Sequence, residues 1–327
     1  RNMLDSDIEK SLDVQGTVFY IGDSRASMKV LEMLNNLHNV KPEALIDNET
    51  NKIEEFEDEA LSIPNEDEIE EGYKKIGESL LISKQKVIEI LTALTSGRHV
   101  LLAGPIGTGK TTLANLIPEI FWERNGGYFT IDFTATADWN TQDVIGGIYP
   151  KMENGQVFYD IQYGCIVETV ANNWAHGING GLRTRYSFPE RNTQYRGVWV
   201  IIDEFNRADI DKAFGQLFTA LRTRYIKIPT SEIGISYKIL KIPQDYRIIG
   251  TLNSADKHFL FQLSDALKSR FAYIEINIPA RSEEKIEMYY AMKNAISELK
   301  INEEDHIDFI TLHNKELQPG KINSDFY

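Results

Sequence analysis

The chain has 327 residues, of which 42% are hydrophobic and 26% charged, and its net charge is −14. This composition is typical of a folded globular protein, and the acidic balance gives no support to nucleic-acid binding through bulk charge. The single cysteine, Cys165, excludes an internal disulfide and a multi-cysteine zinc site and fits a reducing cytoplasm, while no apolar run reaches the roughly 20 residues that span a bilayer.

The N-terminal third is expected to hold two minor regions. Residues 16–22 have the composition of a strand, and apolar residues then recur at helical spacing, so residues 1–46 are predicted to form a small α/β appendage, structural or partner-binding. Residues 47–75 are strongly acidic and indicate either a solvated linker or the exposed face of a helix. A further helix is predicted between a Ser83 cap and Gly97. The chain starts at Arg1 without a recognisable start signal, as a fragment would.

From Arg98 onward, short apolar runs alternate with helical segments. Near-continuous apolar strands imply a mostly parallel sheet covered by helices on both faces. We therefore predict an α/β core over residues 76–280 and a helical lid over 281–327. The expected strands are "HVLLAG", "YFTIDFTA", "VWVIIDE", "YRIIGTL" and "FAYIEINI".

The stretch "LLAGPIGTGKTT" carries the G-x-x-x-x-G-K-[ST] pattern of a phosphate-binding loop. Glycines let backbone N–H groups approach phosphate oxygens, and the helix that follows favours anions at its N-terminus. Lys110 is expected to reach the β and γ phosphates, and the Thr111 hydroxyl to bind Mg²⁺. The residues predicted to bind the nucleotide are Gly104, Gly107, Thr108, Gly109, Lys110, Thr111 and Thr112.

Acidic and amide side chains follow two other predicted strands. "VWVIIDEFNRAD" ends a buried strand on Asp203, placed to hold Mg²⁺, and Glu204, placed to orient or deprotonate a water. "YRIIGTLNSADK" ends another strand on Asn253. Ligands of such sheets bind at the carboxyl ends of the strands, so Asn253 is expected to lie near Glu204.

With these three motifs in order, the chain resembles the AAA+ ATPase superfamily, from about Ser83 to the tail. "SGRHVLLAGPIGTGKT" and "IIDEFNRAD" are similar to its MoxR and dynein-related branch. That resemblance implies a five-stranded core with two β-hairpin insertions, at residues 143–170 and 225–243. In related rings, such hairpins point toward the central pore.

Within that branch, "LNSADK" resembles the Met-Asn-Thr-Ala-Asp stretch of McrB-type restriction motors more than the Gly-Thr-Gln-Asn-Pro of MoxR chaperones. The resemblance implies that Asn253 positions the attacking water and that Asp256 takes part in the same network. It also implies that Arg270 is an arginine finger reaching the neighbouring subunit. Arg207 matches the branch motif and either contacts a neighbour or pairs with local carboxylates.

The resemblance thus implies a Mg²⁺-dependent, ring-forming nucleoside triphosphatase, as a hexamer in the cytoplasm without membrane association. The leading hypothesis is an McrB-like motor that drives DNA translocation or remodelling for a separate nuclease subunit, with DNA contacted by pore loops or the partner. The alternative is a MoxR-like chaperone that remodels a protein complex. ATP and GTP both remain open as the substrate, and a lid arginine is not placed.

Overall fold

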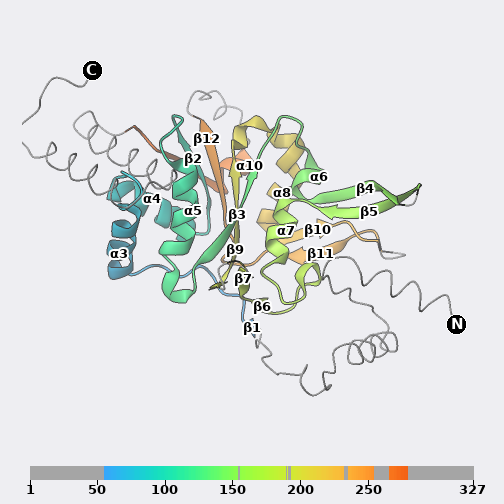
Figure 1. Cartoon of the computed structure of the whole chain (residues 1–327), viewed down its shortest axis with the longest axis horizontal. Coiled ribbons are helices and arrows are strands. Elements are labelled where there is room, and N and C mark those ends of the chain that lie inside the picture. Colours follow the sequence, from blue (N-terminus) through green and yellow to red (C-terminus); the bar gives the residue numbers. More distant parts are fainter. Residues whose placement is uncertain are drawn as a thin grey trace, which may run out of the picture. The chain divides into compact units, whose positions relative to one another are not determined.

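The computed structural model describes residues 55–153, 155–188, 190, 193–231, 235–253 and 265–278. The predicted N-terminal appendage, the predicted lid and Asp256 lie outside these residues. The described part is built on a five-stranded sheet in the order β13-β2-β12-β9-β3, in which every pair is parallel, as predicted (Figure 1). The strands are β2 (His99–Gly104), β3 (Tyr128–Thr134), β9 (Gly197–Asp203), β12 (Ile248–Asn253) and β13 (Phe271–Glu275).

The strands are apolar because helices cover the sheet on both faces. Every residue of β2 is buried, as are the first six of β9 and the first five of β12. In Figure 1, α3, α4 and α5 lie on one side of the strands and α6, α7 and α8 on the other. The helices are α3 (Glu66–Ile76), α4 (Lys84–Thr95), α5 (Lys110–Ile120), α6 (Thr141–Val144), α7 (Cys165–Ala171), α8 (Ile210–Thr223) and α10 (Asp265–Lys268).

Caps fix the helix ends that the sequence predicts. Ser83 accepts a hydrogen bond from the Lys86 N–H at the start of α4, and Gly97 follows its end with a φ of 87°. Within the acidic segment, α3 begins at a capping box formed by Asn65 and Glu68. Of the two predictions for this segment, a solvated linker or a helix, the structure shows the helix over Glu66–Ile76.

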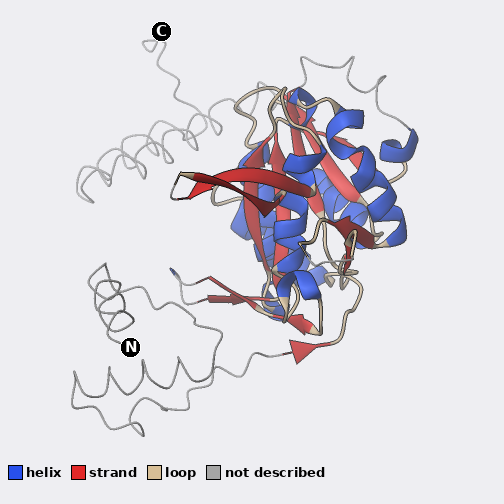
Figure 2. Cartoon of the chain, turned by 90° about the vertical axis from the view of Figure 1, so that its right-hand side faces the viewer, coloured by secondary structure: helices blue, strands red, loops and turns tan. Residues whose placement is uncertain are grey.

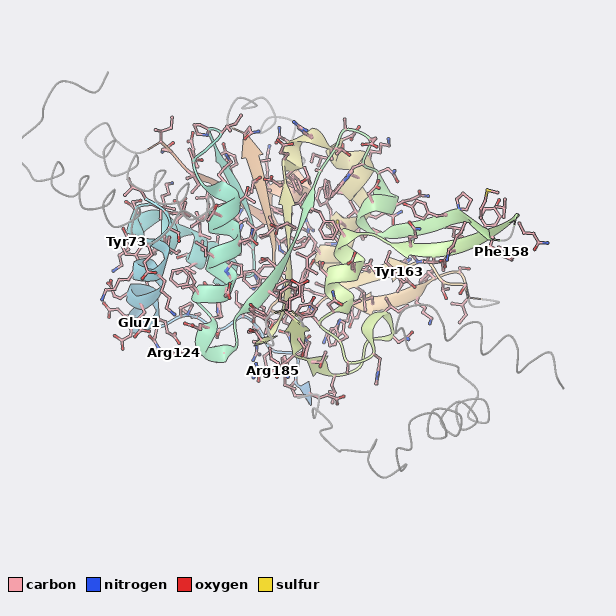
Figure 3. All side chains as sticks on the ribbon, viewed as in Figure 1. Glu71, Tyr73, Arg124, Phe158, Tyr163 and Arg185 are labelled. Carbon is pink, nitrogen blue, oxygen red and sulfur yellow. The ribbon has the colours of Figure 1, made fainter. Side chains whose placement is uncertain are left out.

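Both predicted hairpins are present. β4 (Gly146–Glu153) pairs antiparallel with β5 (Gln156–Tyr163), and β10 (Tyr225–Ile228) pairs with β11 (Lys238–Lys241). The β4–β5 hairpin projects away from the body, with Tyr163 at its base and Phe158 toward its tip (Figures 2 and 3). Two smaller pairs join β7 (Tyr186–Phe188) to β8 (Thr193–Tyr195) and β1 (Glu55–Phe56) to β6 (Arg183–Thr184).

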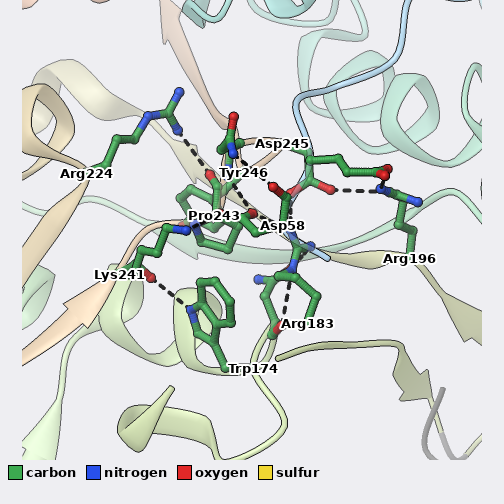
Figure 4. Close-up of polar contacts among 12 residues, drawn as sticks. Asp58, Trp174, Arg183, Arg196, Arg224, Lys241, Pro243, Asp245 and Tyr246 are labelled. Carbon is green, nitrogen blue, oxygen red and sulfur yellow. Dashed lines mark hydrogen bonds and ion pairs between the residues drawn. The ribbon is translucent and has the colours of Figure 1, made fainter. Parts of the chain in front are cut away.

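Charged side chains tie the chain segment after β1 to the core (Figure 4). Arg183 is fully buried, and its Nη1 lies 2.5 Å from Asp245 Oδ1 and 3.2 Å from Asp58 Oδ1. Lys241 Nζ lies 2.8 Å from Asp58 Oδ2. Burial would raise the pKa of Asp58, but the hydrogen bonds from Lys241 and the Gln244 N–H outweigh it and lower that pKa. The segment around Asp58 is thus part of the folded unit.

Three short 3₁₀ turns complete the described elements: η2 (Glu123–Asn125), η3 (Gly177–Asn179) and η5 (Phe205–Arg207). Among the helices that the structure describes, none has the length and apolar character required to cross a bilayer.

Candidate nucleotide site

The phosphate-loop segment joins β2 to α5, as the motif requires. Gly107 and Gly109 have φ values of 85° and 73°, in the left-handed region that favours glycine. A Cβ on Gly104 would lie 2.2 Å from the Ile276 carbonyl oxygen, and one on Gly109 would lie 2.4 Å from Leu80 Cδ2. The glycines are therefore required by backbone conformation and by close packing.

Lys110 lies inside the loop. Its Nζ donates hydrogen bonds to the carbonyl oxygens of Gly104, at 3.0 Å, and Pro105, at 2.7 Å. Burial lowers the pKa of Lys110, while the Asp203 carboxylate acts in the opposite direction. The ammonium is thus held by neutral carbonyl groups, which phosphate oxygens can replace with a stronger, charge-assisted contact.

The other loop residues differ in their surroundings. Thr108 Oγ1 donates to the Pro105 carbonyl oxygen at 2.9 Å, which closes the loop on itself. Thr112 is exposed on the first turn of α5. Because the first N–H groups of a helix have no intrahelical acceptor, this turn can donate to an anion.

Thr111 and Asp203 come from distant parts of the sequence and meet at the carboxyl edge of the sheet. Thr111 Oγ1 donates to Asp203 Oδ1 at 3.1 Å. A hydroxyl and a carboxylate are oxygen ligands of the kind that Mg²⁺ accepts beside phosphate oxygens and water. Among the residues that the structure describes, no group of three or more His, Cys, Asp or Glu side chains is arranged to hold a metal ion. The donor set therefore fits a metal held jointly by protein and nucleotide.

Glu204 follows Asp203 in an unusual backbone conformation. Its φ is 52°, in the left-handed region, which is uncommon for a residue other than glycine. Its N–H donates to Thr251 Oγ1 at 3.2 Å, and its carboxylate pairs with Arg207, whose Nε lies 2.8 Å from Oε2. The turn carries Glu204 out of the strand direction and holds its side chain at the sheet edge.

Thr251 is the site residue that sequence reasoning missed. Its hydroxyl donates to Asp203 Oδ1 and accepts from the Glu204 N–H, so it connects both acidic residues. It lies two residues before Asn253 on β12, and residues two apart share one face of a strand. That alternation is the signal by which the sequence could have indicated it.

Asn253 lies at the predicted edge. It is the last residue of β12, and its register partner on β2 is Gly104, the first residue of the loop. On the other side, the end of β3 meets Asp203 through Thr134. The structure thus brings together the loop, Asp203, Glu204 and Asn253.

Arg270 lies at the opposite end of the same sheet, where the strands begin. Phe271, the next residue, is in register with His99 at the start of β2, whereas Glu275 is in register with Ala103 beside the loop. At about 3.3 Å per residue, β13 separates Arg270 from the loop edge by roughly 16 Å, more than an extended arginine side chain spans. Arg270 is therefore not part of the site of its own chain.

Residues 99–271 match the family described as an AAA domain of the dynein-related subfamily. The Type IV methyl-directed restriction enzyme EcoKMcrB subunit of Escherichia coli (strain K12) is 25% identical over 201 residues, 60% of this chain and 39% of that protein. An ATP-dependent lipid A-core flippase of Paraburkholderia xenovorans (strain LB400) is 34% identical over 89 residues, 27% of this chain and 13% of the flippase.

A crystal structure of a protein assigned as an ATPase, from Cytophaga hutchinsonii, aligns with 68% of this chain and 55% of its own, at 17% identity and a TM-score of 0.43. The chain spans less than half the length of the two curated relatives. The family match extends from the first residue of β2 to the first of β13, over more than half of the chain, and includes the loop, Asp203, Glu204 and Asn253. The chain therefore belongs to the dynein-related subfamily of AAA domains and is a nucleoside triphosphatase of the AAA+ type.

Proposed function

We propose that this chain is a Mg²⁺-dependent subunit of a ring motor of the McrB type, which hydrolyses ATP or GTP at the site formed by the loop and the ends of β9 and β12. The observation that carries the proposal is the meeting of Thr111 and Asp203, 3.1 Å apart, at the edge that also holds Glu204 and Asn253. These groups come from three strand ends and match the parts that phosphoryl transfer requires.

The residues divide the chemical work. The loop N–H groups and Lys110 bind and orient the phosphates, and Glu204 accepts a proton from the attacking water, whose direction Asn253 fixes. Thr111 and Asp203 would hold Mg²⁺, which when bound neutralises charge on the phosphate oxygens. Thr251 positions the two carboxylate-bearing residues through its hydroxyl.

Hydrolysis is proposed to require assembly into a ring, as a hexamer. Arg270 is too far from the loop of its own chain to serve it, so as a finger it has to act on a neighbouring subunit. An arginine finger stabilises charge on the transferring phosphoryl group and contributes about 10³–10⁵ in rate. A lone subunit would bind nucleotide and turn it over slowly.

The McrB-like role rests on the similarity to the Escherichia coli restriction enzyme subunit. We propose that the ring drives DNA translocation or remodelling for a separate nuclease subunit. DNA would be contacted through the hairpins at the pore or through that partner.

The alternative is a MoxR-like chaperone, which one feature of the β4–β5 hairpin favours. Directly opposed residues of an antiparallel pair lie on the same face. One face therefore carries Ile148 with Ile161, Pro150 with Tyr159, and Met152 with Val157, most of them exposed. A face that is apolar and without basic residues suits contact with protein better than with phosphate.

Hydrolysis of ATP and of GTP, each measured with and without DNA, tests these proposals together. DNA-stimulated turnover supports the motor, whereas DNA-independent turnover with a co-purifying protein client supports the chaperone. Glu204→Gln should bind nucleotide and Mg²⁺ but lose about 10²–10⁴ in rate. Near-wild-type hydrolysis by Glu204→Gln would reject the role given to this residue.

A further inference from the structure

The end of α4 fixes the backbone of Arg98. The Gly97 N–H donates to the Leu94 carbonyl oxygen at 3.2 Å, and the Arg98 N–H donates to the Ala93 carbonyl oxygen at 3.1 Å. Together with the φ of 87° at Gly97, these two hydrogen bonds form a Schellman motif. Arg98 therefore leaves the helix in a defined direction, one residue before β2.

The guanidinium of Arg98 reaches the segment around Arg270. Its Nη2 donates to the carbonyl oxygens of Lys268, at 3.0 Å, and Phe271, at 2.5 Å. Lys268 is the last residue of α10, so its carbonyl has no intrahelical partner and favours a cationic donor. The two acceptors lie on either side of Arg270, and one guanidinium thus ties both ends of the loop that carries it.

Two backbone hydrogen bonds also hold Arg270. The His99 N–H donates to the Arg270 carbonyl oxygen at 2.8 Å, and the Arg270 N–H donates to the Leu267 carbonyl oxygen at 2.9 Å. Arg98 itself is exposed, so its side chain contributes little to the core. The contact between Arg98 and the Arg270 loop therefore orients a surface segment.

We infer that Arg98 is a positioning residue for the arginine finger: it fixes the backbone around Arg270 so that this side chain meets the nucleotide of the neighbouring subunit. The inference rests on the proposed function, since a finger needs a neighbour to act on. Loss of Arg98 would leave the binding of nucleotide to the chain's own loop intact, because that loop lies at the carboxyl ends of the strands and Arg98 lies where β2 begins. What it would impair is the chemical step in the adjacent site.

The test compares Arg98→Ala with Arg270→Ala in the full chain under assembly conditions. Arg98→Ala should assemble, bind nucleotide with wild-type affinity and lose roughly 10- to 100-fold in kcat, as expected when a catalytic group is misplaced by about 1 Å. Arg98→Lys should recover part of the rate, because an ammonium can still donate to one of the two carbonyls. Arg124→Ala, which removes an exposed arginine elsewhere, is the matched control and should keep full activity.

Mixed rings separate positioning from a general structural defect. Lys110→Ala subunits have a defective loop but intact Arg98 and Arg270, so they should restore activity to Arg98→Ala subunits, as to Arg270→Ala subunits. Mixing Arg98→Ala with Arg270→Ala should give no recovery, since both lack a working finger. A subunit that is simply misfolded would not be rescued in either mixture.

The outcomes keep the inference apart from the proposed function. If Arg270→Ala is inactive and Arg98→Ala is fully active, the positioning role is wrong and the finger stands. If Arg270→Ala is fully active, both are wrong. A loss in Arg98→Ala equal to that in Arg270→Ala, with no recovery in Arg98→Lys, would make Arg98 a finger itself and overturn the positioning role.

If Arg98→Ala fails to assemble, the Arg98→Lys variant decides alone. A wild-type rate of Arg98→Lys with unchanged Mg²⁺ and nucleotide dependence contradicts the inference. A reduced kcat of Arg98→Lys that Lys110→Ala subunits rescue supports it.

Discussion

Arg207 Nε lies 2.8 Å from Glu204 Oε2, within the turn that follows β9. Of the two partners that the sequence leaves open for Arg207, the structure shows the local carboxylate. Arg207 is more than half exposed, so the pair is screened by water and contributes about 1 kcal/mol or less to stability. Its importance therefore lies in how it holds the proposed general base.

Arg207→Gln should leave the free energy of unfolding within about 1 kcal/mol of wild type and lower kcat by about tenfold or less, because Glu204 remains available. Steady-state hydrolysis beside Glu204→Gln checks this. A loss as large as that of Glu204→Gln would instead show that Arg207 takes part in the chemistry, through a neighbouring subunit.

Thr251→Val removes one hydroxyl while keeping the branched shape that fits the strand. The Glu204 N–H loses its acceptor and Asp203 loses a donor. We therefore expect the apparent affinity for Mg²⁺ to fall by about 10- to 100-fold, as for other residues that orient metal ligands. Titration of hydrolysis against Mg²⁺ measures the effect. Thr251→Ser keeps the hydroxyl and is the control; equal behaviour of the two variants would contradict the role given to Thr251.

The positions of most site residues at the strand ends could be predicted from the sequence, because each is set locally. The loop, the Asp203–Glu204 pair and the end of the strand at Asn253 are each set within one strand and the residues beside it, and parallel strands bring their ends to one edge. Thr251 was missed because its importance depends on the neighbouring strand. Arg98 was missed because its acceptors lie about 170 residues away in the sequence.

The buried charges were hidden for the same reason. Arg183 comes from a region without a recognisable motif, and Asp58 from a segment whose acidity indicated a solvated face. Both become interpretable once Asp245 lies between Arg183 and Arg196. Sequence spacing contains no information on such long-range pairs.

His99 should make stability depend on pH. It is buried, its Nδ1 accepts from the Ile248 N–H at 3.0 Å, and burial, together with Arg247 and other nearby arginines, holds its pKa well below 6.5. Between the folded and unfolded pKa values the unfolded chain binds a proton that the folded chain does not. The contribution of His99 to the free energy of unfolding is therefore full above about pH 6.5. It is lost as the pH falls further, by up to about 1.4 kcal/mol per pH unit.

Urea unfolding of nucleotide-free protein between about pH 7.5 and 5.5 measures this slope. His99→Asn offers an amide oxygen to the Ile248 N–H without a titratable ring, so its slope should be shallower than that of wild type. Since the other five histidines are common to both proteins, their contributions cancel in the comparison. Parallel slopes would show that His99 is not the source.

Arg183→Met should be the most destabilising of these changes. The variant leaves the buried Asp245 carboxylate with two partners. The Tyr128 hydroxyl lies at 2.8 Å, and the more distant Arg196 Nε lies at 3.4 Å (Figure 4). Removing one partner of a buried pair costs about 3–5 kcal/mol, because the remaining charge stays desolvated with fewer partners to compensate it. Denaturant unfolding without nucleotide should show this loss.

The control for Arg183→Met is Arg124→Met, which breaks the exposed pair with Glu71, labelled in Figure 3. It should change the free energy of unfolding by about 0.5 kcal/mol or less. Equal effects of the two variants would mean that the buried cluster around Asp245 contributes no more than a surface ion pair.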